Sequence, residues 1–170
     1  FLNAYKVIPI SGGHSRKALE DVNQLLREGA VVCLFPEGAI SHTGQLGEFK
    51  RGFEIAAKDS NAVIVPFYLR GLWGSRFSRS GSKLQETSKG GMKRDVIVAY
   101  GEAMSADSTA AQVKHKVFEL SISAWQTYTD TLPCIDKAFV QTMKAAPAAW
   151  AITDVEGQPL SHSRLLTAVL

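Results

Sequence analysis

The stretch most capable of chemistry is residues 35–41, which read Phe-Pro-Glu-Gly-Ala-Ile-Ser. It follows the apolar run of residues 30–35, so we expect a buried strand to stop at Pro36 and to present a carboxylate there. Glu37 can accept hydrogen bonds from substrate hydroxyls, and Gly38 lets a ligand approach the backbone because it has no side chain. The alternative is a bare turn, which proline and glycine form for local reasons.

Two further stretches add a cation and an interrupted strand. Residues 49–53 read Phe-Lys-Arg-Gly-Phe, which places the cations Lys50 and Arg51 between two aromatic residues. Residues 63–68 read Val-Ile-Val-Pro-Phe-Tyr, an apolar strand broken by Pro66 and followed by Gly-Leu-Trp-Gly at residues 71–74. From these residues alone, a ligand site and a bare turn at residues 36–38 both stay open.

Apolar periodicity predicts alternating strands and helices around these stretches. Helices are expected at residues 15–28, 49–58 and 107–128. Strands are expected at residues 6–10, 30–35, 62–69 and 95–100. This order predicts an α/β fold with an open, mostly parallel sheet and helices on both faces, where ligands gather at the carboxyl ends of the strands.

Changes in composition divide the chain into three parts. We expect residues 1–130 to form one domain, the alanine-rich residues 131–148 to form a linker or helix, and residues 149–170 to begin another domain. Because the sequence starts Phe-Leu-Asn, we expect it to be cut from a longer protein.

Bulk properties exclude several classes of function. The net charge of +3, with both signs scattered along the chain, disfavours nucleic acid as a partner. No apolar stretch approaches the roughly 20 residues that span a bilayer, and neither common nucleotide-binding glycine motif occurs. Two cysteines far apart predict neither a disulfide nor a metal site, and Cys33 is expected to be buried in its apolar run.

In order and spacing, the three stretches resemble the PlsC-type glycerolipid acyltransferases, in which Phe-Pro-Glu-Gly is the third sequence block and Val-Pro is the fourth. The resemblance covers about residues 1–128 and implies a glycerol-3-phosphate acyltransferase-like fold. It implies transfer of a fatty acyl group from acyl carrier protein (ACP) or coenzyme A to a lysophospholipid, with no tightly bound cofactor and no metal. The implied substrate contacts are Phe35, Pro36, Glu37, Gly38, Ser41, Lys50, Gly52 and Pro66. Among them, the resemblance implies that Lys50 meets the phosphate as a point charge and that Pro66 shapes the pocket wall.

The sequence departs from this family at the catalytic block. The family uses a His-x4-Asp block, whose histidine is the general base and whose aspartate orients the ring. The four histidines here lack an aspartate five positions later; they are His14, His42, His115 and His162. We therefore expect an N-terminally truncated acyltransferase with no catalytic residue of its own, which is inactive by itself.

A second departure concerns the acceptor. Ala39 and Ile40 stand where the family has Thr-Arg, which removes a bidentate phosphate donor. The apolar residues 7–10 likewise lack the arginine of the family's second block. These changes favour a phosphodiester acceptor, such as a lysophospholipid with an ethanolamine head group, over lysophosphatidic acid.

The fuller pattern, which includes Gly-Leu-Trp-Gly-Ser at residues 71–75, resembles the bifunctional 2-acylglycerophosphoethanolamine acyltransferase/acyl-ACP synthetases. In that group an adenylate-forming domain follows the acyltransferase, and residues 149–170 would be its beginning. The resemblance implies a peripheral or tethered position at the cytoplasmic face of the bacterial inner membrane, with ACP as a candidate partner. The alternative is a non-catalytic lipid- or carrier-docking module of a larger protein.

Residues 70–94, here called the basic segment, are rich in lysine and arginine with aromatic residues among them. Cations and apolar side chains together suit an anionic membrane surface, and the predicted contacts are Trp73, Arg76 and Phe77. The alternative is a solvated loop whose aromatic rings pack on the domain.

Overall fold

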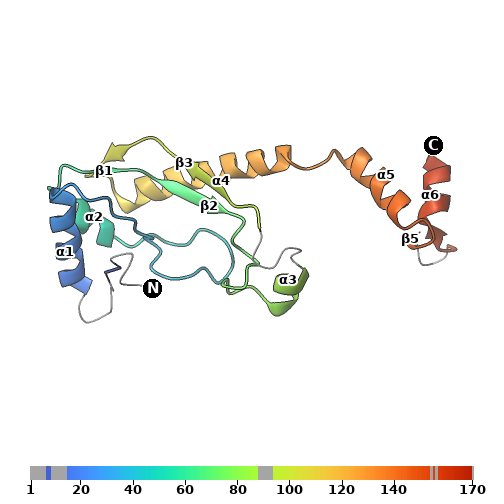
Figure 1. Ribbon diagram of the computed structural model, residues 1–170, viewed down its shortest axis with the longest axis horizontal. Helices are drawn as coiled ribbons and strands as arrows, with labels where there is room; N and C mark the ends of the chain where they lie inside the picture. The colour runs from blue at the N-terminus through green and yellow to red at the C-terminus, as the bar shows by residue number, and fades with distance from the viewer. Residues whose placement is uncertain (1–6, 9–14, 88–93, 154, 156, 170) are drawn as a thin grey trace. The chain divides into compact units, whose positions relative to one another are not determined.

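The computed structural model describes residues 7–8, 15–87, 94–153, 155 and 157–169. Helices and short two-stranded sheets alternate along the chain (Figure 1), which confirms the mixed α/β class. The chain divides into two compact units, Phe1–Gln126 and Thr127–Leu170. Most of the strand predicted at residues 6–10 lies outside the described residues.

A pair of helices forms one packed part of the larger unit (Figure 1). Helix α1 (Ser15–Arg27) follows the predicted periodicity and buries Val22 almost completely. Helix α2 (Gly52–Ala57) begins later than the predicted residue 49. Lys50 instead donates its backbone N–H to the Pro36 carbonyl at 2.8 Å, which ties the chain to the preceding loop before the helix starts.

The side chain of Asn23 joins the two helices. Its amide nitrogen donates to the carbonyls of Ala56 (2.8 Å) and Lys58 (2.7 Å) at the end of α2. Its oxygen accepts from Arg27 at 2.9 Å. One side chain on α1 therefore satisfies carbonyls that the end of a helix leaves without an intrahelical partner.

Two antiparallel ladders build the sheet structure of this unit. Strand β2 (Phe67–Arg70) pairs with β3 (Ile97–Tyr100), and β1 (Val63–Ile64) pairs with β4 (Met104–Ser105). The strands predicted at residues 62–69 and 95–100 are thus present, but every pairing among the described strands is antiparallel. Apolar periodicity predicts a strand without fixing the direction of its neighbour, which explains the difference from the mostly parallel sheet that we expected.

Pro66 separates β1 from β2. Proline has no N–H to donate to a ladder, but its carbonyl accepts from Gly101 N at 2.8 Å. A Cβ on Gly101 would lie 2.9 Å from Pro66 Cγ, so the glycine makes room for the ring. The proline predicted to shape a pocket wall thus packs inside the sheet.

The apolar residues 30–35 form no ladder in the structure, contrary to the predicted strand. Cys33 is exposed, so its predicted burial is wrong, and Val31 is also fully exposed. The physical reason is that this run has no strand partner among the described residues, so its apolar side chains gain no cover.

Helix α4 (Ala110–Asp130) corresponds to the helix predicted at residues 107–128. Thr109 and Gln112 form a capping box: Thr109 N–H donates to Gln112 Oε1 at 2.8 Å, and Gln112 N–H donates to Thr109 Oγ1 at 3.4 Å. Val113 and Val117 are buried on one face of the helix. The cap explains why the helix starts at Ala110.

The described part of the smaller unit holds the end of α4, two further helices and a two-stranded ladder. Helix α5 (Ile135–Ala145) lies within the residues predicted as a linker or helix. Strands β5 (Trp150–Ile152) and β6 (Leu160–Ser161) pair antiparallel, and α6 (His162–Val169) follows. Across the ranges that the structure describes, we find no helix that combines the length and apolar character needed to cross a membrane.

Candidate substrate site

Residues 36–50, here called the substrate loop, are closed at their base by backbone hydrogen bonds. Gly38 N–H donates to the Phe35 carbonyl at 3.0 Å, and Lys50 N–H donates to the Pro36 carbonyl at 2.8 Å. Gly38 has a φ of +67°, which favours glycine. The Pro-Glu-Gly sequence is therefore a true turn, and the base of the loop brings residues 36–38 beside residue 50.

Lys50 lies directly across Gly38. A Cβ at residue 38 would be 2.8 Å from Lys50 Nζ and 3.2 Å from its Cδ and Cε. The absence of a side chain at Gly38 thus gives the lysine its position. The structure brings together the predicted cation and the predicted open backbone, an arrangement able to bind an oxyanion by charge and by proximity of the main chain.

Glu37 turns back into its own loop. Its Oε2 accepts from Gly47 N–H at 3.0 Å, and a Cβ on Gly47 would come within 2.8 Å of the same oxygen. One carboxylate oxygen therefore closes the loop. We predicted Glu37 as an acceptor for substrate hydroxyls, and the geometry leaves this role to the other oxygen.

Ser41 organises the tip of the loop. Its hydroxyl oxygen accepts from Gly44 N–H at 2.9 Å and donates to the Gln45 carbonyl at 3.1 Å. Ser41, predicted as a substrate contact, thus uses its hydroxyl group for local hydrogen bonds that fix a compact turn.

The other predicted contacts support the loop from outside. Phe35 meets Phe67 of β2 edge to face, with ring centroids 5.9 Å apart. Gly52 opens α2, where a Cβ would make ordinary contact with Leu19 at 3.5 Å. Pro66, by contrast, is buried between β1 and β2.

The basic segment touches the substrate loop at two places. The ring of Trp73 covers Gly44, and Arg79 Nη1 lies 2.6 Å from His42 Nε2. Of the predicted membrane contacts, Phe77 is 78% exposed whereas Trp73 is only 36% exposed. Two cations of the basic segment, Lys89 and Lys93, lie outside the described residues.

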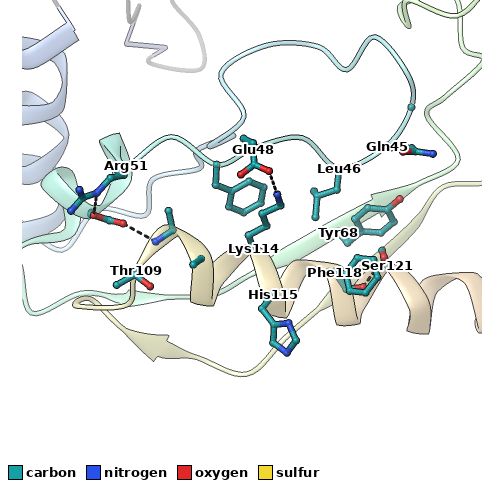
Figure 2. Close-up of a pocket in the computed structure, with 15 residues that line it drawn as sticks. Gln45, Leu46, Glu48, Arg51, Tyr68, Thr109, Lys114, His115, Phe118 and Ser121 are labelled. Carbon is teal, nitrogen blue, oxygen red and sulfur yellow. Dashed lines mark hydrogen bonds and ion pairs between the residues drawn. The ribbon is translucent and has the colours of Figure 1, made fainter.

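A pocket of about 1080 Å³ lies between residues 44–54 and α4 (Figure 2). Apolar walls come from Leu46, Phe49, Tyr68 and Phe118, and Lys114 forms an ion pair with Glu48 across it. Sequence reasoning missed this pocket. The spacing of Lys114, Phe118 and Ser121 along one face of α4 was the available signal.

Glu54 joins the pocket wall to the start of α4 (Figure 2). Its Oε1 accepts from Ala110 N–H at 2.7 Å, and its Oε2 pairs with Arg51 at 2.9 Å. The Ala110 N–H, followed by Arg51, lowers the pKa of Glu54 below the usual glutamate value. The carboxylate form thus holds the N-terminus of α4.

This contact predicts a pH-dependent stability. Because the folded-state pKa is lowered, the stabilisation is fully present above the unfolded-state pKa of about 4.3 and is lost as the pH falls through the lower folded value. We expect Glu54→Gln to lower the unfolding midpoint at pH 7 and to flatten its decline below pH 5. Thermal unfolding followed by circular dichroism from pH 3 to 7 tests this. A parallel decline in both proteins would contradict it, and the exposed Glu28→Gln is the control.

Comparison with known proteins supports the resemblance in the first part of the chain. Residues 1–70 match the family model described as Acyltransferase. The chain is 36% identical over 81 residues to a "Probable 1-acyl-sn-glycerol-3-phosphate acyltransferase" of Mycoplasma pneumoniae, covering 47% of this chain and 30% of that protein. It is 53% identical over 49 residues to a chloroplastic 1-acyl-sn-glycerol-3-phosphate acyltransferase of Arabidopsis thaliana, covering 28% and 14%.

A chloroplastic 1-acyl-sn-glycerol-3-phosphate acyltransferase of Brassica napus is 49% identical over 49 residues. The chain spans less than a third of the length of each of these relatives. No solved structure matches it significantly.

Proposed function

We propose that the chain, whose first 70 residues match the Acyltransferase family, is part of a glycerolipid acyltransferase. The enzyme would move a fatty acyl group from acyl-ACP or acyl-coenzyme A to the hydroxyl of a lysophospholipid. The observation that carries this proposal is the position of Lys50 Nζ across Gly38, which sets a cation beside open backbone at the turn after Phe35. A phosphate group of the acceptor fits that arrangement.

In the proposed reaction, the acceptor hydroxyl oxygen attacks the thioester carbonyl. A new C–O ester bond forms, the C–S bond breaks, and the hydroxyl proton passes through a base to the leaving thiolate. In related enzymes the base is the histidine of a His-x4-Asp block, which this sequence lacks. The 170 residues would therefore contribute acceptor binding, and a block elsewhere in the protein would contribute the base.

The acceptor class follows from the residues after Gly38. Ala39 and Ile40 offer no side-chain donor for a doubly charged phosphomonoester, and Lys50 supplies one positive charge. We therefore propose a phosphodiester lysophospholipid, with an ethanolamine head group as the first candidate. The similarity to bifunctional acyltransferase/acyl-ACP synthetases supports the same choice, together with a peripheral or tethered position at the cytoplasmic face of the bacterial inner membrane.

The test is to express the protein from its complete coding region and to assay acyl transfer to lysophosphatidylethanolamine and to lysophosphatidic acid, with both thioester donors. We expect transfer with the ethanolamine acceptor preferred, and no transfer by the 170-residue chain alone. Absence of transfer by the complete protein with every pair would reject the proposal. Binding of lysophospholipid without transfer would then favour a non-catalytic docking module.

We also propose that the basic segment rests on anionic lipid, since Phe77 and Arg76 are both exposed. Each cation near an anionic surface contributes about 1 kcal/mol, so Arg76→Glu should weaken binding to phosphatidylglycerol vesicles about tenfold or more. Phe77→Ala should also weaken it, and salt should reduce wild-type binding.

Co-sedimentation with vesicles at several salt concentrations measures these effects. Lys17→Glu on the exposed side of α1 makes the same change in net charge and is the control. An equal loss in this control would mean that binding depends on total charge and not on the basic segment.

A further inference from the structure

The substrate loop is braced by a segment that lies far from it in the sequence. A Cβ on Gly44 would lie 2.5 Å from Trp73 Cδ2 and 2.7 Å from Cγ, so the indole lies flat against a residue that has room for it only because it is glycine. Gly44 has a φ of +78°, so the turn also needs glycine for its backbone. The second contact is the 2.6 Å approach of Arg79 to His42.

Hydrogen bonds hold the backbone around both contact residues, Trp73 and Arg79. Arg94 Nη1 donates to the carbonyls of Gly71 (3.0 Å) and Trp73 (2.9 Å), which fixes the backbone that carries the indole. On either side of Arg79, Gln85 Nε2 donates to the carbonyls of Ser78 (3.1 Å) and Ser80 (3.0 Å). Residues 72–80, here called the strap, are thus cross-linked by hydrogen bonds along their length.

The contact at Gly44 also restrains Glu37, through hydrogen bonds within the substrate loop. The strap contacts Gly44, whose N–H is bonded to Ser41, and three residues later Gly47 N–H donates to the Glu37 carboxylate. Moving the indole away would leave this tight turn without its outer support. The turn would then no longer fix Gly47 against Glu37.

We infer that Trp73 and Arg79 are positioning residues, which orient Glu37 and the acceptor site through Gly44 and His42. The inference rests on the proposed function for its kinetic consequence, although the brace itself is independent of it. Trp73 contributes more than Arg79, since a packed ring excludes water from the turn whereas an exposed polar pair is weak. The basic segment therefore serves the substrate loop as well as the lipid surface.

The brace is tested by hydrogen exchange on the 170-residue chain in the absence of substrate. We expect Trp73→Ala to speed exchange in peptides covering residues 38–47 about tenfold, with Arg79→Gln weaker and Trp73→Phe close to wild type. Peptides from α1 and α4 should not change. Phe77→Ala and Trp150→Ala remove exposed aromatic rings and are the controls. Unchanged exchange in Trp73→Ala, or faster exchange throughout the unit, would overturn the inference.

The consequence for activity is tested in the protein from the complete coding region, with a lysophospholipid dispersed in detergent so that vesicle binding plays no part. We expect Trp73→Ala to raise the KM for the acceptor about tenfold, to leave the KM for the acyl thioester unchanged, and to be rescued by Trp73→Phe. If no variant, including wild type, transfers an acyl group, the proposed function fails while the exchange result stands. If wild type is active and Trp73→Ala has an unchanged acceptor KM, the inference alone fails.

Discussion

Replacing Gly71 with alanine is expected to destabilise the larger unit by about 3 kcal/mol, which lowers its unfolding midpoint by on the order of 10 °C. Gly71 has a φ of +102°, a conformation that alanine adopts only with strain. The added Cβ would also lie 2.3 Å from the carbonyl oxygen of Asp95, a backbone atom that no change of rotamer can move aside.

The clash between residues 71 and 95 would lie at one end of the β2–β3 ladder and would affect both strands. Gly71 follows the end of β2, and Asp95 precedes β3, whose Ile97 is paired with Arg70. Pushing the two backbones apart would open this end of the ladder and would draw Gly71 away from Arg94, which donates to its carbonyl. A steric change at one position therefore costs backbone hydrogen bonds as well as strain.

Two other glycines separate the contributions to this loss. Gly29 has a φ of +84° with nothing within 4 Å of an added Cβ, so Gly29→Ala measures the backbone strain alone. Gly81 has open space and no positive φ, so Gly81→Ala measures neither strain nor clash, apart from a small effect on the start of α3 (Ser82–Thr87). We expect the midpoint to fall most for residue 71, less for residue 29 and least for residue 81. Equal losses at residues 71 and 29 would show that the ladder absorbs the clash.

The spacing of apolar residues predicted the structure correctly where a single helix buries one apolar face. The spacing of apolar residues in α1 correctly predicts which side is covered, since Ala18 and Val22 are buried. The helix expected at residues 15–28 ends at Arg27, and Gly29, two residues later, has a positive φ. Helical periodicity is encoded within one segment, so the sequence contains the whole signal.

Contacts between distant segments could not be predicted in this way. Nothing local in the apolar run around Cys33 shows whether a neighbouring strand will cover it, and the described residues provide none. Similarly, Gly44 looks like an ordinary turn glycine until the ring of Trp73 is found against it. The family pattern identified Glu37 and Lys50 as site residues, but only the folded loop shows that the glutamate closes the loop while the lysine lies beside Gly38.

Replacing Lys50 with methionine is expected to raise the KM for the lysophospholipid about 10- to 100-fold in the complete protein. Methionine keeps a long apolar side chain and removes the charge, and a hydrogen bond to a charged group is worth about 1.5 to 3 kcal/mol. The KM for the acyl thioester should change little, because we assign Lys50 to the acceptor phosphate. Lys58→Met removes an exposed lysine at the end of the next helix and is the matched control.

Replacing Gly38 with alanine should have the same effect without touching the lysine. The new Cβ would lie 2.8 Å from Lys50 Nζ, so the ammonium group must move, and the φ of +67° adds strain to the turn. Gly29→Ala carries similar strain with no cation nearby, and its acceptor KM should stay at the wild-type value. If Gly38→Ala and Lys50→Met act on the same contact, the double variant should be no worse than the more impaired of the two single variants. Additive losses would mean that Gly38 serves the acceptor by some route other than the position of Lys50.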